Sequence, residues 1–412
     1  MFKFNSKFNF IFFLTLTLQA CANVNVKEDH EIKSPAMKAT PNYPLDFQDL
    51  IDRTVSAAIP GIVLLVETED YKFLGSTGVA DIEKQLKMPT NAMMPNASAG
   101  KTLTALLVVM LHEEGLLDIN VPISQYLSEE LLSQIEHSNS MTLSHLLSHT
   151  SGIYDYLNNK EVFDVVMNSP SKLKTDKYLI KFALNKPASF LPGEQFEYSN
   201  TGYLLTGLIL DKVLGFHHSK AMRQRVLAPL GMNRSYYKGV EKNRNEIISG
   251  YFTNDNGHSI IGKNETINTK VMQENIGVAD APLVSTVEEL ALLLRMTITG
   301  SDIITGTMQD MLFGEDNLND MGYKWYGNYN ADYGKGMFTE NFKNTLIYHH
   351  GGVGLGYNTN NVYIPESNIS ITTFANCGAS DACDNKLHNM VTKILASVIY
   401  SAHDDFMEHN GK

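Results

Sequence analysis

The chain has few cysteines, a single tryptophan and no excess of basic residues. Its 412 residues include three cysteines, and 33 lysines and arginines against 45 aspartates and glutamates give a net charge of −12. This charge excludes the usual electrostatic attraction to nucleic acids and to anionic membrane surfaces. The sequence also lacks internal repeats and low-complexity tracts. Its content of 43% hydrophobic and 19% charged residues is typical of a soluble globular protein, with length for one large domain or two ordinary ones.

The apolar run near the N-terminus is too short to span a bilayer. It covers residues 10–18 and follows Lys3 and Lys7, an arrangement typical of an export signal. Leu-Gln-Ala-Cys at 18–21 resembles a bacterial lipoprotein cleavage box, in which Cys21 would become the lipidated first residue. The alternative is an ordinary secretory signal that is cut close to the same place.

This pattern divides the chain into three parts. We expect a signal peptide over 1–20, a polar, lipidated tether over 21–44 that contains three prolines, and one folded domain over 45–412. The protein would then be exported to the periplasm and anchored to a membrane by its lipid, to the outer membrane in a Gram-negative cell. We expect the folded domain to be a monomer.

The two remaining cysteines predict a disulfide. Cys377 and Cys383 lie six residues apart, between an expected strand over 370–375 and an expected helix over 385–400. An exported protein folds in an oxidising compartment, where such a pair can close a small loop. Two lone thiols do not complete a zinc shell, so we expect no metal at these cysteines.

The histidines offer another route to a metal site, which we weigh against a structural role. His145 and His149 are spaced i, i+4 and would share one face of a helix. No acidic residue that could act as a base separates them, and the segment lacks the pattern of a zinc hydrolase. We therefore expect both side chains to form hydrogen bonds within the helical part of the protein.

Strand patterns occur near both ends of the expected domain, and helical patterns fill its middle. Strands at both ends favour one antiparallel sheet that the N-terminal and C-terminal segments build together, with flanking helices. The fold class is then α+β, with the helical part as a large insertion and the site in the cleft between the lobes. We expect the only tryptophan, Trp325, in the core. The expected strands are 61–68, 71–80, 346–350, 358–364 and 370–375; the α/β lobe is 45–97 with 330–405, and the helical lobe is 98–329.

Ser98 and Lys101 lie where a long amphipathic helix is expected to begin. Apolar residues recur with i, i+3, i+4 spacing from Leu103 to Leu111, and Gly115 closes the run. The positive end of the helix dipole favours an oxyanion on the serine. A lysine one turn further on can accept the serine proton if burial disfavours the lysine charge. The pair predicts acyl transfer through a covalent intermediate, whereas three other Ser-x-x-Lys pairs lie in polar stretches and are expected in loops.

A second motif, Tyr198-Ser199-Asn200, follows a Pro-Gly turn and precedes an apolar helix over 203–214. The Tyr198 phenol could pass a proton between the serine and a leaving group, if the lysine keeps the phenol pKa low. The Asn200 amide could bind both a substrate carbonyl and the lysine nitrogen. The alternative is an ordinary turn at the start of a helix.

A third motif, His350-Gly351-Gly352-Val353, stands at the end of an expected strand. Two successive glycines allow another backbone to approach closely. The backbone N–H of Val353 could then form an oxyanion hole together with that of Ser98. A glycine-rich hairpin turn is the alternative.

In this order the three motifs resemble those of the serine β-lactamase and penicillin-binding family, in particular its class C-like branch. That branch includes D-alanyl-D-alanine carboxypeptidases, D-aminopeptidases, esterases and class C β-lactamases. Segments 141–153, 227–232 and 281–290 are similar to the family as well. The resemblance implies a serine β-lactamase-like fold that works without a metal or an organic cofactor. It implies Ser98 as acylated nucleophile, Lys101 as its base partner and Tyr198 as proton relay, with Asn200, His350, Gly351, Gly352 and Val353 as substrate-binding residues.

The third motif departs from the pattern of many β-lactamases and transpeptidases, which have Lys-Thr-Gly or Lys-Ser-Gly at this place. This chain thus lacks the permanent cation and the hydroxyl that would bind a substrate carboxylate there. His350 can be charged only in part near neutral pH. We expect an exported serine hydrolase that cleaves an amide or ester through acyl-Ser98, with D-Ala-D-Ala-type peptides from peptidoglycan as the first substrate class. Activity as an esterase or β-lactamase is the alternative within the same fold. A penicillin-receptor-like lipoprotein that binds without turnover is the alternative of another class.

Overall fold

The computed structural model describes residues 43–241, 246–255, 260–327 and 329–410, with backbone alone for 402–410. These described residues belong to one compact unit. The expected signal peptide, Cys21 and nearly all of the expected tether lie outside the described residues. Within the described part, no helix has the length and hydrophobicity to cross a membrane.

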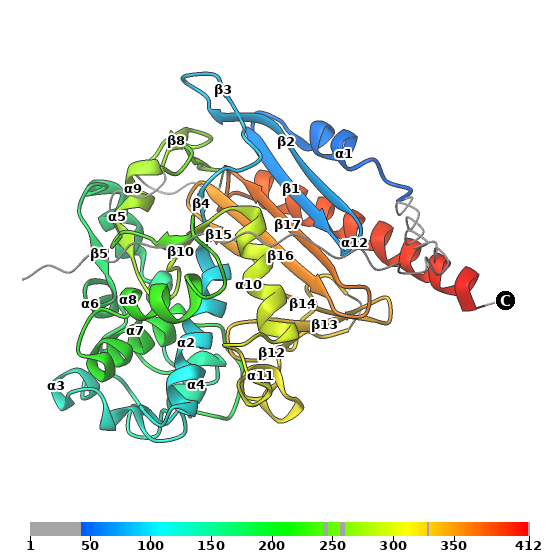
Figure 1. Cartoon of the computed structure of the whole chain (residues 1–412). Coiled ribbons are helices and arrows are strands. Elements are labelled where there is room, and N and C mark those ends of the chain that lie inside the picture. The colour runs from blue at the N-terminus through cyan, green and yellow to red at the C-terminus, as the bar shows by residue number, and fades with distance from the viewer. Residues whose placement is uncertain (1–42, 242–245, 256–259, 328, 411–412) are drawn as a thin grey trace, which may run out of the picture. The chain divides into compact units, whose positions relative to one another are not determined.

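A large antiparallel sheet combines strands from both ends of the chain (Figure 1). Its order is β11-β12-β13-β14-β16-β17-β1-β2-β3, with β15 paired to β16. The N-terminal β1 pairs directly with the C-terminal β17, so that Val63 lies opposite Phe374. This confirms the predicted fold class. The strands are β1 (Gly61–Glu67), β2 (Lys72–Asp81), β3 (Leu86–Lys87), β11 (Asn319–Asp320), β12 (Asp332–Tyr333), β13 (Phe338–Phe342), β14 (Thr345–His349), β15 (Gly352–Gly354), β16 (Tyr357–Ile364) and β17 (Ile369–Ala375).

Both faces of this sheet are covered, which explains why β1 is apolar at every position from 62 to 66. Ile62 and Leu64 belong to a cluster with the helices α1 (Phe47–Thr54) and α12 (Asp381–Asn410). Val63 and Leu65 point to the other face, where α10 (Val287–Thr299) and the helical part of the molecule lie (Figure 1). The two-residue period of a strand thus supplies one hydrophobic set to each face.

The middle of the chain is mainly helical, with short strands between the helices. The strand β10 pairs with β4 on one side and β6 on the other, and β4 leads directly into the Ser98 segment. The helices are α2 (Lys101–Glu113), α3 (Glu129–Leu132), α4 (Leu143–Leu147), α5 (Lys160–Asn168), α6 (Asp176–Leu179), α7 (Asn200–Leu214), α8 (Ser219–Met222), α9 (Lys270–Glu274) and α11 (Gly306–Phe313). The short strands are β4 (Met94–Pro95), β5 (Lys174–Thr175), β6 (Tyr236–Tyr237), β7 (Tyr251–Thr253), β8 (Thr266–Asn268), β9 (Ile276–Gly277) and β10 (Leu283–Ser285).

The prediction that α2 is amphipathic was wrong. Every residue from Lys101 to Leu111 is buried, including Thr102 and Thr104. The two threonine hydroxyls donate hydrogen bonds to the carbonyls of Gly336 and Ala279, so polar atoms on the supposed outer face are satisfied inside the protein. The helix α2 is therefore a central element that other segments surround, and its first residue is buried with it.

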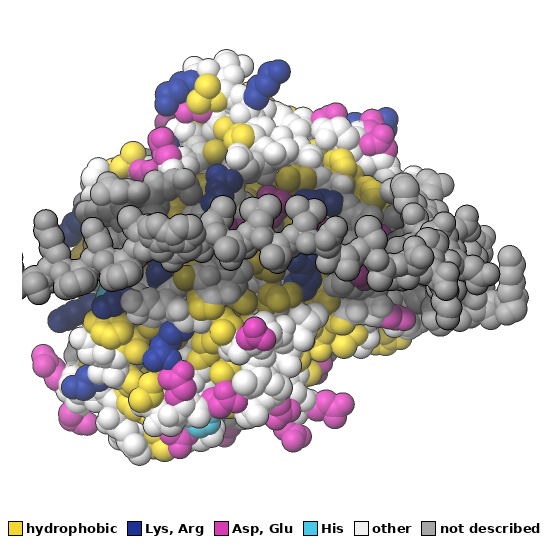
Figure 2. Space-filling model, in the orientation of Figure 1, with side chains coloured by type: hydrophobic (Ala, Val, Ile, Leu, Met, Phe, Trp, Pro, Cys, Tyr) yellow, Lys and Arg dark blue, Asp and Glu magenta, His cyan; other side chains and the backbone are white. Residues whose placement is uncertain are grey.

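Cys377 and Cys383 form the predicted disulfide. The bond connects the residues that follow β17 with the first turn of α12, the helix that covers one face of the sheet. Elsewhere on the surface, charges of both signs are interspersed on the coloured part of the face in Figure 2, and no continuous basic stripe is visible there.

Candidate active site

The structure brings Ser98, Lys101 and Asn200 into direct contact. Lys101 Nζ donates hydrogen bonds to Ser98 Oγ at 3.0 Å, to Asn200 Oδ1 at 2.8 Å and to the carbonyl oxygen of Asp280 at 2.9 Å. Three acceptors match the three protons of an ammonium group. A neutral amine keeps two protons for Asn200 and Asp280, so its lone pair faces Ser98 Oγ. The arrangement is therefore suited to remove the serine proton.

Burial favours the neutral form of this amine. The Lys101 side chain is fully buried, which lowers its pKa to about 8, although the charges of Asp280 and Asp155 partly offset the effect. About a tenth of the Lys101 side chains are then neutral at pH 7. A base poised near neutral pH is what general-base catalysis requires.

Ser98 lies just before the α-helix and not, as was predicted, at its start. It belongs to a 3₁₀ turn over Ala97–Gly100, and the α-helix begins only at Lys101. Ala97 has a φ of +46°, a conformation that a non-glycine residue seldom adopts. This tight turn presents the half-buried Ser98 hydroxyl ahead of the helix, while the first N–H groups of the turn have no partner within it.

Asp155 fixes the orientation of Asn200 and was not foreseen from the sequence. Asn200 Nδ2 donates to Asp155 Oδ2 at 2.8 Å. Because a carboxylate only accepts, the amide must turn its oxygen toward Lys101, and one N–H remains for a substrate. Burial raises the pKa of Asp155, and its hydrogen bonds from Leu157 and Asn200 act in the opposite direction.

Asp280 was also missed, although a signal for both acids was present. Asp155 lies two residues after segment 141–153, and Asp280 directly precedes segment 281–290, the stretches that resembled the family. The Asp280 side chain is buried and accepts a hydrogen bond from Tyr156, and its pKa is raised by burial.

Tyr198 lies beside the pair but holds its proton. Burial raises the pKa of its phenol well above the usual value, and the hydrogen bond with Ser98 offsets this only in part. Lys101 Nζ lies 5.2 Å from the centre of the Tyr198 ring. The hypothesis that the lysine keeps the phenol pKa low is therefore wrong. Tyr198 is a proton donor at rest, and Lys101 is the group that can accept a proton.

His149 packs on Tyr198, a contact that the sequence analysis did not predict. The α-helix α4 ends at Leu147, and His149 has a φ of +58°, so the proposed shared helix face of His145 and His149 does not exist. The ring centres of His149 and Tyr198 are 3.9 Å apart, and the backbone N–H of Ser199 donates to His149 Nδ1. Burial lowers the pKa of His149 well below its usual value, so the ring is neutral.

The glycines of the third motif bring β15 against the Ser98 turn. A Cβ atom added at Gly352 would lie 2.2 Å from the carbonyl oxygen of Asn96 and 2.9 Å from the backbone nitrogen of Ser98. Only glycine permits this approach. The next residue, Val353, is paired with Asn358 of β16. The backbone groups that the predicted oxyanion hole requires therefore come from adjacent segments.

His350 lines the site without offering a charge or a free donor. Its Nδ1 bonds the carbonyl oxygen of Gly351 at 2.7 Å, so Nδ1 carries the proton, and Nε2 accepts from the Tyr333 hydroxyl at 3.1 Å. Burial, together with the Lys101 charge, lowers the His350 pKa well below its usual value. The expectation of a partial positive charge on His350 is thus corrected, because the buried imidazole is neutral.

An open pocket of about 230 Å³ lies over these groups. Its lining combines Ser98, Tyr198 and residues 350–353 with the aromatic rings of Tyr323, Trp325 and Phe338. Trp325 is 38% exposed, so its expected place in the core was wrong. An exposed aromatic that stacks on Phe338 at 5.6 Å provides an apolar wall at the mouth of the pocket.

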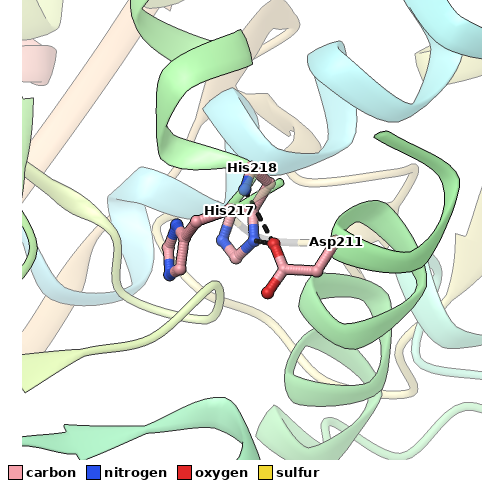
Figure 3. A group of neighbouring side chains, drawn as sticks. All are labelled: Asp211, His217 and His218. Carbon is pink, nitrogen blue, oxygen red and sulfur yellow. Dashed lines mark hydrogen bonds and ion pairs between the residues drawn. The ribbon is translucent and has the colours of Figure 1, made fainter. Parts of the chain in front are cut away.

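Asp211, His217 and His218 form a separate group whose ligand atoms lie within 4.8 Å of one another (Figure 3). The buried His218 is already engaged at both ring nitrogens, with Asp211 at 2.8 Å and the Tyr237 hydroxyl at 2.7 Å. The His217 ring stacks on that of His218. These contacts are sufficient to fix the turn between α7 and α8, so we assign the group a structural role.

Comparison with known proteins decides the family. The model of the Beta-lactamase family matches residues 47–391. This chain belongs to the Beta-lactamase family. Penicillin-binding protein 4* of Bacillus subtilis is 26% identical over 306 residues, which are 73% of this chain and 64% of that protein. The chain thus spans somewhat less than two thirds of the length of that relative.

Two solved structures support the same fold for this member of the Beta-lactamase family. D-amino acid amidase from Ochrobactrum anthropi SV3 has a TM-score of 0.71 at 21% identity, covering 86% of this chain and 99% of the amidase. The octameric penicillin-binding protein homologue from Pyrococcus abyssi has a TM-score of 0.70 at 25% identity, covering 85% and 77%. Because that homologue is octameric, our expectation of a monomer stays a prediction.

Replacing Gly352 by alanine should abolish most activity without unfolding the protein. The added Cβ would collide with the Asn96 carbonyl and displace the Ser98 N–H, and the loss of an oxyanion donor lowers kcat by about a hundredfold or more. The control is Gly354→Ala, because a Cβ there would meet its nearest heavy atoms at an ordinary 3.7 Å. Steady-state kinetics on an activated ester and thermal melts test this, and equal activity of both variants would contradict it.

The activity of this Beta-lactamase family member should rise with pH. Only the neutral amine of Lys101 can accept a proton, so kcat/KM should climb to a plateau above pH 8, and at pH 6 should be about a hundredth of the plateau. Asp155→Asn removes a negative charge that favours the protonated lysine, so it should move the profile to lower pH. A pH-rate profile of both proteins checks this. A flat profile, or a shift to higher pH in the variant, would contradict the assignment.

Proposed function

We propose that the protein is a serine hydrolase that cleaves amides or esters through an acyl-Ser98 intermediate. The observation that carries this proposal is the contact between Lys101 Nζ and Ser98 Oγ, with a buried lysine whose other acceptors are fixed. A buried lysine with a purely structural role does not require a serine hydroxyl at the edge of a pocket as a partner. A lysine that acts as the base in acyl transfer requires that hydroxyl, because the serine is its nucleophile.

The chemical steps follow from the positions of the groups. Lys101 Nζ takes the hydroxyl proton while Ser98 Oγ attacks the substrate carbonyl carbon. The carbonyl oxygen becomes an oxyanion, which the N–H groups of Ser98 and Val353 would stabilise. The leaving group takes a proton from Tyr198, which regains one from Lys101, and departs as a neutral amine or alcohol. Water then attacks acyl-Ser98 with the same base, and the carboxylic acid product leaves.

For the acyl donor we propose peptides or amides that contain D-amino acids. Support comes from the relatives, which include a penicillin-binding protein and, among the solved structures of this fold, a D-amino acid amidase. The proposed location supports the same class, since a lipoprotein anchored through Cys21 after export would meet fragments of peptidoglycan. Small esters are the second candidate. They are favoured by the pocket, because none of its described lining residues is a lysine or arginine that could pair with a carboxylate.

Labelling combined with turnover tests the proposal. The purified protein is incubated with a fluorophosphonate or a fluorescent penicillin, and the adduct is located by mass spectrometry. We expect the adduct on Ser98, and none in Ser98→Ala or Lys101→Ala. Nitrophenyl esters of increasing chain length, a D-Ala-D-Ala tripeptide and nitrocefin are then compared in steady state.

The outcomes separate the competing functions. Turnover of an ester or peptide that is lost in Ser98→Ala supports the hydrolase. Labelling at Ser98 without steady-state turnover would replace the hydrolase by the receptor-like binding protein. Activity that survives Ser98→Ala at the wild-type level would contradict both functions.

A further inference from the structure

The pocket beside Ser98 has a side that can be assigned to the leaving group. Tyr198 is the group that holds a proton at rest, and a leaving group must receive a proton as it departs. Tyr198 packs against the cluster of Met321, Tyr333 and Phe338. The part of the substrate that is released therefore lies next to this cluster and to the residues in front of it.

That side of the pocket is an aromatic wall. Tyr323 and Trp325 are 41% and 38% exposed, and both line the pocket together with Phe338. The Trp325 ring stacks on Phe338 with an interplanar angle of 23°, and Phe338 stacks on His349 at 5.1 Å and 12°. Neighbouring exposed aromatic rings at the entrance of a site are typical of a surface that binds an apolar group.

A buried, hydrogen-bonded carboxylate holds the wall in place. Glu340 accepts hydrogen bonds from the backbone N–H groups of Tyr326 and Gly327 and from His349 Nε2. Burial alone would raise the Glu340 pKa, but these bonds outweigh it and keep the carboxylate ionised. The segment that follows Trp325 is thus tied to β13 before any ligand arrives, so the wall is preformed.

The described lining of the same side offers no positive charge to a carboxylate. The described residues that line the pocket include no lysine or arginine, and His350 is neutral with both ring nitrogens occupied. A carboxylate placed against the wall would lose water without gaining a cationic partner, which is unfavourable. Lys324 is the neighbouring cation in sequence, but its side chain is not part of the pocket lining.

We propose that this subsite takes an uncharged aromatic leaving group. This inference rests on the proposed acyl-Ser98 chemistry and specifies its product. The amine or alcohol that departs carries an aromatic ring against Trp325 and Tyr323, and lacks a free carboxylate. The preferred substrates are then aromatic amides, aromatic esters or peptides blocked at the C-terminus, and release of free D-alanine is a minor reaction.

Three substrates with one acyl group test the proposal. N-acetyl-D-alanine is joined to D-phenylalaninamide, to D-phenylalanine with a free carboxylate, and to glycinamide, and kcat/KM is measured for each. We expect the first to exceed each of the others by about tenfold or more, the factor that one aromatic contact provides. Equal or better hydrolysis of the free acid would overturn the proposal.

Variants locate the effect. Trp325→Ala should lower kcat/KM for the D-phenylalaninamide substrate by about tenfold more than for the glycinamide substrate. Tyr323→Ala should shift the ratio of the two kcat/KM values in the same direction. Because Tyr323 is even more exposed than Trp325, this second variant keeps the test valid if Trp325→Ala misfolds. Lys324→Ala is the matched control and should leave all three substrates unchanged. Selective loss of the free-acid substrate in Lys324→Ala would show that a carboxylate is recognised after all, and would overturn the proposal.

A binding measurement separates this inference from the proposed function. If none of the three substrates is hydrolysed by the wild-type protein, the proposed class of D-amino-acid peptides and amides is contradicted. Calorimetry with Ser98→Ala then tests the subsite alone, with D-phenylalaninamide and D-phenylalanine as ligands. Tighter binding of the amide by about tenfold supports the aromatic, uncharged subsite, and equal or tighter binding of the acid overturns it.

Discussion

The chemistry of this protein depends on one buried amine. Lys101 is the first residue of a helix that is buried from Lys101 to Leu111. Because a buried amine is shielded from solvent, its Nζ needs hydrogen-bond partners within the protein. The side chain of Asn200 and the carbonyl of Asp280 supply two hydrogen-bond acceptors, and the Ser98 hydroxyl supplies the third. Burial lowers the lysine pKa to about 8, which converts a residue that is normally a cation into a usable base.

The fold assembles the groups around this amine from distant parts of the chain. Ser98 comes from the 3₁₀ turn before α2, Lys101 from the start of α2 and Asn200 from the start of α7. The glycine motif lies on β15, which pairs with β16. The sheet unites both ends of the chain, and Gly352 lets β15 approach the Ser98 turn without a side chain between them. The same sheet carries Glu340 and His349, which position the aromatic wall. The scaffold thus fixes both the reacting groups and the shape of the pocket.

Local patterns in the sequence predicted the sheet and the main catalytic candidates, because strand periodicity and the Ser98 to Lys101 spacing are short-range properties. The contacts that the sequence did not reveal are long-range. Asp155 reaches Asn200 across 45 positions, and the Asp280 carbonyl reaches Lys101 across 179. Burial caused the other differences: it raised the Tyr198 pKa and removed the expected charge from His350. The apolar residues of α2 predicted that one face of the helix is buried. They could not reveal that other segments of the chain bury the opposite face as well.

The most direct test follows the Lys101 amine itself. With lysine labelled at Cε with ¹³C, the Lys101 signal can be assigned by its loss in Lys101→Arg and followed by NMR as a function of pH. The expected midpoint of this signal is about pH 8, the pKa of the buried amine. A midpoint near that of an exposed lysine, about 10.4, would mean that the amine stays charged at neutral pH and would contradict its role as the base.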